Sequence, residues 1–126
     1  NLQPDTIQFG IGIDSALHFK GIQNGFLDPI HGMYWTWQSG YINFKIEGRI
    51  KTDNKPWQKI EYHIGGYRSP YNCFQVWNCT AYNYEYDVSV VLKPWLDAHM
   101  YTIMSPGQDA FKFSTRLPHA FKQKAN

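Results

Sequence analysis

Charge is scarce in this chain, and neither sign dominates. The 126 residues include 12 lysines and arginines and 10 aspartates and glutamates, which gives a formal net charge of +2. Charged residues make up 17% of the chain, against about a quarter in an average soluble domain. Proteins that bind nucleic acid or an anionic membrane use a clustered basic surface. The sequence therefore predicts no nucleic-acid partner.

Long apolar runs are also absent. No segment approaches the roughly 18 consecutive apolar residues of a membrane-spanning helix. The N-terminal Asn1-Leu2-Gln3-Pro4-Asp5 does not have the pattern of a signal peptide, so any export signal would lie upstream of it. With the length of one domain, the chain is expected to form a single domain over residues 1–126.

Cysteine is limited to Cys73 and Cys79. Two thiols are too few for a structural zinc site, which takes four ligands. Their closeness within an aromatic, asparagine-rich segment favours a small disulfide and an oxidising compartment. The alternative is a pair of buried free thiols, because unpaired cysteine is often found in protein cores.

Carboxylates are sparse as well, and their spacing does not point to a paired general acid and base. Ser15 lies in no nucleophile-elbow motif. These absences disfavour a hydrolase, and we expect no enzymatic activity.

Aromatic residues, in contrast, are abundant and concentrated. They make up 17% of the chain, and the segment Met33-Tyr34-Trp35-Thr36-Trp37-Gln38-Ser39-Gly40-Tyr41 is the densest run. In an extended chain Trp35 and Trp37 project to the same side. The run therefore predicts either an aromatic wall of the core or a site that uses the indoles chemically.

Alternation of apolar and polar residues predicts strands along most of the chain. The expected strands cover residues 6–14, 41–51, 57–64 and 84–92, with an irregular loop over 67–83. The second and third strands flank a turn signal at residues 53–56 and should form a hairpin. On its return strand Ile60, Tyr62 and Ile64 share one face, which leaves His63 off the main hydrophobic face.

The C-terminal region predicts helix instead. Ser105 and Pro106 look like a helix start, and Pro118 should divide the helix into two short pieces. Phe121 continues the helical spacing, and residues 122–126 look like a frayed tail. The expected fold is all-β, mostly antiparallel and β-sandwich-like, with a short C-terminal helix.

Five histidines and three methionines suit copper better than structural zinc, because imidazoles and thioethers match the softness of copper. His31 precedes the aromatic run, His63 precedes Gly65-Gly66, and His99-Met100 with Met104 forms a second cluster. For each histidine the alternative is a surface or hydrogen-bonded residue, and the two later methionines are equally compatible with core packing.

Several segments together resemble the MbnP-like domain, whose relatives include a copper-binding partner of methanobactin systems. The resemblance covers nearly the whole chain, and Met104-Ser105-Pro106-Gly107 before a terminal helix extends it. Its segments are Phe9-Gly10-Ile11-Gly12-Ile13-Asp14-Ser15, Leu27-Asp28-Pro29, the run from Gly32 to Lys45, and Tyr62-His63-Ile64-Gly65-Gly66.

The resemblance implies an exported β-rich domain at the periplasm or cell surface, often an outer-membrane-associated lipoprotein in Bacteroidetes. In such domains histidines and a tryptophan oxidised to kynurenine hold copper, and a dihaem peroxidase-like partner makes that oxidation. His63 matches the histidine before the glycine pair, and Trp35 and Trp37 match the tryptophan pair. His31 is a further candidate ligand. The chain resembles the C-terminal half of the domain, so the N-terminal half is expected to complete the site.

The rival interpretation is a non-catalytic subunit of an outer-membrane or surface protein complex that binds no metal. Exposed tyrosines and tryptophans are residues that partner proteins contact. Metal content and stoichiometric co-purification discriminate between the two.

Overall fold

The computed structural model describes residues 5–51, 54–81, 88–91 and 102–123, and most of its regular structure is β-strand. β1 (Asp5–Ile11) pairs with β5 (Gln75–Ala81), and β6 (Val88–Val90) pairs with β8 (Phe121–Gln123), both antiparallel. The largest sheet has the order β2 (Tyr34–Thr36), β3 (Gly40–Ile50), β4 (Gln58–Gly65) and β7 (Thr102–Ile103), with only β7 parallel to its neighbour. The predicted all-β, mostly antiparallel fold is confirmed.

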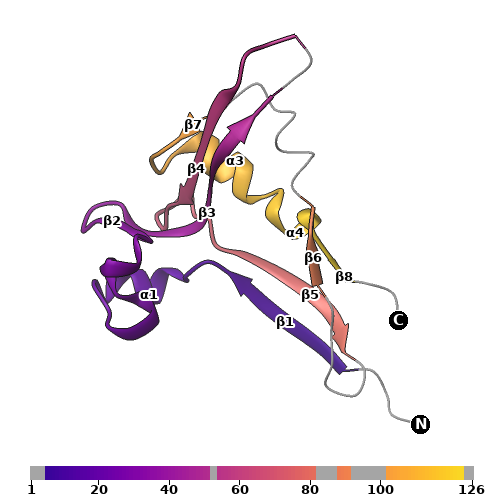
Figure 1. Ribbon diagram of the computed structural model, residues 1–126. Coiled ribbons are helices and arrows are strands. Elements are labelled where there is room, and N and C mark those ends of the chain that lie inside the picture. The colour runs from indigo at the N-terminus through magenta and orange to yellow at the C-terminus, as the bar shows by residue number, and fades with distance from the viewer. Residues whose placement is uncertain (1–4, 52–53, 82–87, 92–101, 124–126) are drawn as a thin grey trace.

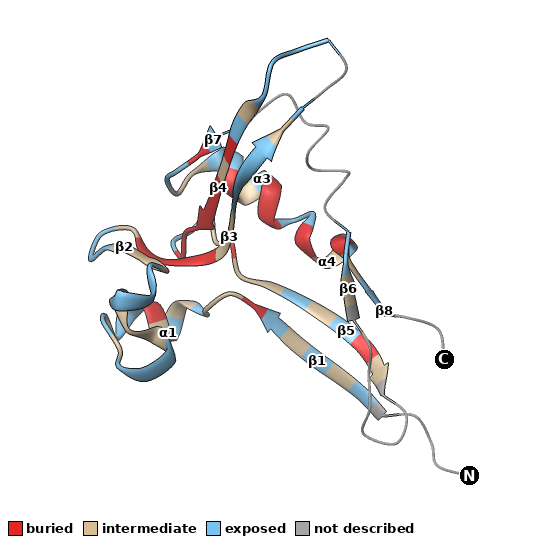
Figure 2. Ribbon diagram, in the orientation of Figure 1, coloured by how far each residue is buried: buried red, intermediate tan, exposed pale blue. Residues whose placement is uncertain are grey.

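The predicted hairpin is present as β3 and β4, with Ile50 opposite Gln58 next to the turn. Ile60, Tyr62 and Ile64 are buried on one face of β4, as their alternation indicated. Figure 2 shows that the part of the hairpin near the helices is buried, whereas its far end is exposed. The hairpin is therefore anchored at one end and projects at the other.

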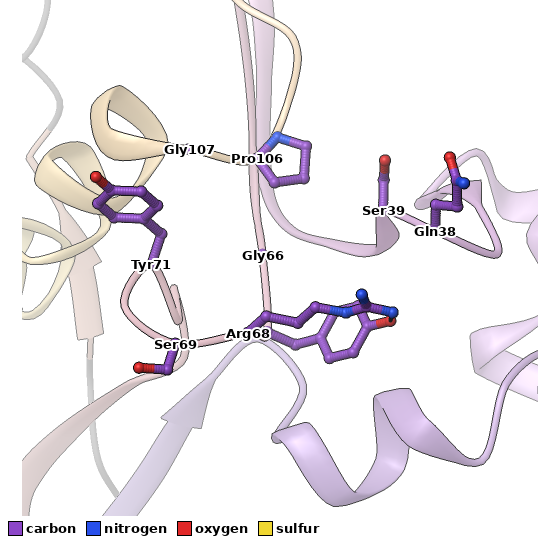
Figure 3. A pocket seen from close by; sticks show the side chains of 9 residues that line it. Gln38, Ser39, Gly66, Arg68, Ser69, Tyr71, Pro106 and Gly107 are labelled. Carbon is purple, nitrogen blue, oxygen red and sulfur yellow. Dashed lines mark hydrogen bonds between the residues drawn. The ribbon is translucent and has the colours of Figure 1, made fainter.

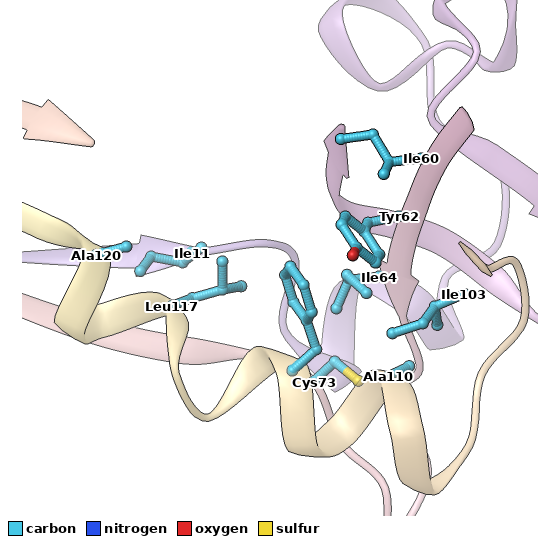
Figure 4. Packing of buried hydrophobic residues seen from close by; sticks show 10 residues of the cluster. Ile11, Ile60, Tyr62, Ile64, Cys73, Ile103, Ala110, Leu117 and Ala120 are labelled. Atoms are coloured by element: carbon cyan, nitrogen blue, oxygen red, sulfur yellow. The ribbon is translucent and has the colours of Figure 1, made fainter. Parts of the chain in front are cut away.

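Helix α3 (Gln108–Ser114) packs against β4 of the hairpin, whereas α4 (Leu117–Ala120) packs mainly against β5 and β8. Ala110, Phe113 and Leu117 are buried in the core, and the rings of Tyr62 and Phe113 lie 4.9 Å apart. Each fully buried large side chain of this kind contributes about 1.5–3 kcal/mol. The cluster in Figure 4 consists of Ile11, Ile60, Tyr62, Ile64, Cys73, Ile103, Ala110, Phe113, Leu117 and Ala120.

The C-terminal segment is divided as predicted, but it starts and ends differently. The residue before α3 is Gly107, and no side chain caps the helix, so the expected Ser105 cap is not formed. Pro118 lies in the first turn of α4, where its missing N–H costs no helical hydrogen bond. Phe121 is not helical, and Lys122 and Gln123 are not a frayed tail, because all three pair with β6. Residues 124–126 lie outside the described residues.

The predicted disulfide is not formed, and both cysteines are free and buried. Residues 67–83 were expected to be an irregular loop, but residues 75–81 form β5, which pairs with β1. Cys79 lies inside this strand, whereas Cys73 lies before it and packs in the core. A strand advances about 3.3 Å per residue, so the two Cα atoms are much farther apart than the roughly 7 Å limit for a disulfide.

The segment between β1 and β2 forms a small lobe of short helices: α1 (Ser15–Phe19), η1 (Gly25–Leu27) and η2 (Pro29–His31). Asp14 caps α1 by accepting from the Leu17 N–H at 2.8 Å, and Asp28 caps η2 through Ile30. The first strand ends at Ile11 rather than Asp14. Gly12, with φ +95°, has Asn43 so close that a Cβ would lie 2.3 Å from its Cγ.

The strand predicted over residues 84–92 is described only in part. β6 falls within residues 84–92, while residues 84–87 and residue 92 lie outside the described residues. Within the described ranges, no helix is long and apolar enough to cross a membrane.

Candidate functional site

His63 lies on the outer face of the hairpin, opposite Lys45 on β3. Its side chain is turned away from the core cluster, as predicted, yet the residue is only 8% exposed. The ring Nε2 lies 2.7 Å from Oε1 of Glu47. This hydrogen bond from His63 is the main cause that lowers the pKa of Glu47 below its ordinary value.

The Glu47 contact fixes how the imidazole can act. An ionised carboxylate only accepts hydrogen bonds, so Nε2 of His63 carries the proton and donates. In the neutral ring Nδ1 then keeps the lone pair, which is the form that ligates a metal. A carboxylate behind the opposite ring nitrogen is the usual outer partner of a metal-binding histidine. The pair is chemically suited to supply one imidazole ligand.

Trp35 packs over Gly65, two residues after His63 in β4. A Cβ at residue 65 would lie 2.9 Å from Cζ3 and 3.2 Å from Cη2 of Trp35, and 2.6 Å from the Tyr41 carbonyl oxygen. Residues two apart in a strand share a face, so Trp35 covers the same face that carries His63. The glycine at position 65 is what lets the indole approach the strand.

The indole of Trp35 is held without a hydrogen bond. Its Nε1 is buried and has no partner among the described residues. A buried donor left unpaired costs about 1–3 kcal/mol. A buried polar atom without a partner calls for an explanation, and a functional role is one. Among the described residues, Nε2 of His18, Nδ2 of Asn43 and Oε1 of Gln58 are in the same condition.

Trp37 and His31 are placed differently from Trp35 and His63. Trp37 follows the end of β2 and is 76% exposed, so the two tryptophans do not share a buried surface. The register shift between Tyr34 and Thr36 breaks the extended geometry that the alternation assumed. His31 ends η2, is exposed, and its Nε2 lies 3.1 Å from the Gly25 carbonyl oxygen.

Lys45 brings a positive charge to the same face. Its Nζ lies 3.4 Å from Oε1 of Glu47 and donates to the Gly32 carbonyl oxygen at 3.5 Å. This links the end of η2, and with it the backbone next to His31, to the strand that carries Glu47.

Among the described residues, no three histidine, cysteine, aspartate or glutamate side chains gather closely enough to hold a metal. His99 and Met100 lie outside the described residues, and Met104 is 44% exposed.

His18 is a buried histidine that the sequence pattern did not single out. It is 5% exposed, stacks on Tyr67 with ring centroids 4.6 Å apart, and its Nδ1 accepts from the Tyr41 N–H at 3.3 Å. A Cβ at residue 40 would lie 2.5 Å from that nitrogen, so Gly40 makes room for the ring. Burial lowers the pKa of His18 below its ordinary value. Tyr41 and Tyr67, which His18 contacts, are remote from it in the sequence. Gly40, next to Tyr41, is the one sequence feature that agrees with these contacts.

A small hollow next to the end of β4 is of another kind (Figure 3). Its volume is about 180 Å³, and it is lined by Gln38, Ser39, Gly66, Tyr67, Arg68, Ser69, Tyr71, Pro106 and Gly107. The Arg68 guanidinium donates to the Tyr67 hydroxyl at 3.1 Å. Neither a carboxylate nor an imidazole nor a thiol lines it, so it is not a metal site.

Comparison with known proteins identifies a family for this chain. The model of the MbnP family matches residues 2–106, which is most of the chain. Neither a curated protein nor a solved structure matches.

Proposed function

Because the chain belongs to the MbnP family, we propose that it is an exported copper-binding protein of the cell envelope. The observation that supports this best is the hydrogen bond between the buried His63 and the exposed Glu47, on the face of β4 where Trp35 packs against Gly65. One imidazole nitrogen is engaged by a carboxylate, and the other keeps a lone pair that suits copper. Periplasmic or surface location, and the absence of catalysis, belong to the same proposal.

Trp35 is the tryptophan that we propose as a ligand after oxidation to kynurenine. Cleavage of the indole C2–C3 bond with addition of two oxygen atoms, followed by hydrolytic release of C2 as formate, exchanges an unpaired buried N–H for an aryl ketone and an aromatic amine. Both are groups that can ligate a metal. Trp37 is 76% exposed and lies off this face, so it is the less suitable of the predicted pair. The oxidant is one molecule of dioxygen or two of hydrogen peroxide, and a dihaem peroxidase-like partner would catalyse the reaction.

His63 and Trp35 do not make a complete site. Within the described part of the chain the nearest additional side chains are Glu47, which is engaged by His63, and Lys45, which is cationic. We therefore propose that further ligands come from His99 and Met100, from His31, or from the N-terminal half of the family domain. Copper would then join parts of the protein that are distant in sequence.

A copper titration tests the ligand assignment. His63→Ala should weaken copper binding at least tenfold, and Glu47→Gln should weaken it about 10–100-fold because it removes the outer partner of the imidazole. His119→Ala is the matched control, since His119 is an exposed histidine on α4. Unchanged affinity in folded His63→Ala protein would remove His63 from the site.

Peptide mass spectrometry of protein purified from its native host tests the oxidation. The expected result is a kynurenine at position 35 and an intact indole at position 37. Both indoles intact would remove the kynurenine part of the proposal and leave the histidine assignment to the titration.

A second candidate function is a metal-free subunit of a surface complex, and one observation favours it. The segment between β1 and β3 exposes large apolar side chains at fractions between 61% and 99%, and proteins often bind partners through exposed apolar side chains. They are Phe19, Ile22, Phe26, Ile30 and Trp37. Stoichiometric co-purification with a membrane complex, together with no copper in the purified protein, would favour this function over the first.

A further inference from the structure

The projecting end of the β3–β4 hairpin is strongly basic. Arg49, Lys51, Lys55 and Lys59 are all exposed there, and this end extends away from the helices (Figure 1). These four positive charges exceed the formal net charge of +2 of the whole chain. Asp53, outside the described residues, is the one acidic residue between positions 49 and 59. The positive charge of the protein is thus concentrated at the end that is farthest from its core.

The strand register places like charges opposite one another on the outer face. Glu47 is opposite Glu61, and Arg49 is opposite Lys59. Like charges directly opposite in a sheet destabilise the pairing. The acidic row is compensated, because Glu47 contacts Lys45 at 3.4 Å and Glu61 contacts Lys59 at 2.6 Å.

The basic row is compensated only in part. Lys59 has Glu61 as its partner, whereas Arg49 makes no ion pair with a described residue. The hairpin therefore keeps an uncompensated guanidinium opposite an ammonium group. An acidic group from outside the molecule would relieve this arrangement.

An exposed tryptophan lies beside the two cations. Trp57 is 64% exposed and borders a shallow hollow of about 530 Å³ with Glu47, Gly48, Arg49 and Lys59. Trp57, Arg49 and Lys59 are all exposed, so the indole and the two cations are accessible to a partner. Tryptophan and arginine are the residue types that most often contribute strongly to protein interfaces.

We propose that this hairpin end is a docking surface for an acidic segment of a partner protein. Carboxylates of that segment contact Arg49 and Lys59, and an apolar or aromatic side chain beside them packs on Trp57. A flat anionic membrane fits less well. The acidic row Glu47–Glu61 lies only about 7 Å from the basic row, so the occupant needs charges spaced to match. The surface borders the proposed copper site at Glu47, but its contacts through Arg49, Trp57 and Lys59 do not require copper.

An NMR titration of the whole chain, without copper, tests the proposal. The probe is an acetylated peptide with two glutamates on each side of one phenylalanine, compared with its lysine counterpart. The acidic peptide should shift the Trp57 indole N–H and the amides of residues 47–50 and 57–60. Affinity should fall at least fivefold in Arg49→Gln/Lys59→Gln and should decrease with added salt.

The matched control is Arg116→Gln/Lys122→Gln, which removes the same charge from exposed positions outside the hairpin. This variant should bind the peptide as the unaltered protein does. Equal weakening in both variants would overturn the proposal, because net charge alone would then explain binding. It would also be overturned if phosphatidylglycerol vesicles bound through Arg49 and Lys59 while the acidic peptide did not.

Discussion

A single methyl group at Gly65 should disrupt the hairpin where Trp35 packs on it. In Gly65→Ala the new Cβ would lie 2.6 Å from the Tyr41 carbonyl oxygen and 2.9 Å from Cζ3 of Trp35. The first neighbour is backbone in the paired strand, and the second belongs to a partly buried ring, so neither can move freely. Overpacking of this kind costs about 1–3 kcal/mol. The expected result is a free energy of unfolding that is lower by that amount.

Gly48→Ala is the matched control in the same hairpin. There the nearest atoms to an added Cβ are those of Ile60 at 3.8 and 3.9 Å, which is ordinary van der Waals contact. Removing a glycine from a strand then reduces the entropy of the unfolded chain and should stabilise by about 0.4–1 kcal/mol. The two alanine variants should therefore change stability in opposite directions.

Urea unfolding followed by circular dichroism measures both variants under identical conditions. The midpoint should fall for Gly65→Ala and rise for Gly48→Ala, with similar slopes. If Gly65→Ala were as stable as the unaltered protein, the packing of Trp35 against Gly65 would be wrong. The proposed neighbourhood of Trp35 and His63 would then lose its geometric basis.

Other predictions concern titration and thiols. Because burial lowers the pKa of His18, the contribution of the neutral ring to stability should be complete above about pH 6.5, the pKa in the unfolded chain, and should be lost as the pH falls below it. Urea midpoints measured from pH 8 to 5 should show this loss. The His18→Gln variant should have a flatter profile. Since both thiols are free and buried, a thiol reagent should label neither in the folded protein and both after unfolding, and a reductant should not change stability. Burial also raises the pKa of the Cys73 thiol, so its low reactivity should persist above neutral pH; rapid labelling of the folded protein would contradict this.

The hairpin was predictable because its information is local. Alternation over residues 42–50 and 60–64 gave the strands, the buried face and the outward position of His63, and the structure has all three. The break near Pro118 was predictable for the same reason, since proline acts on its own backbone. These features need no knowledge of what lies elsewhere in the chain.

The rest depends on contacts between distant segments. β5 does alternate Trp77 and Cys79 with Asn78 and Thr80, but the asparagines and cysteines of this segment favoured a loop. Its partner is the remote β1, with Gln8 opposite Asn78. The missed strand is also why the disulfide prediction was wrong. In the candidate site, the side of the strand that carries His63 followed from alternation. The contact of Trp35 with Gly65 required the β2–β3 register shift, which no local pattern contains.

The β1–β5 pair has a consequence for how the chain folds. Its nearest paired ends, Ile11 and Gln75, enclose roughly 60 residues, whereas Ile50 and Gln58 of the hairpin enclose roughly seven. Closing the longer loop costs about 2 kcal/mol more entropy by the logarithmic rule. During synthesis at about 5–20 residues per second, β1 must wait several seconds for its partner strand to be made. β1 is therefore still unpaired when the β3–β4 hairpin has been made, and it pairs only once β5 has followed.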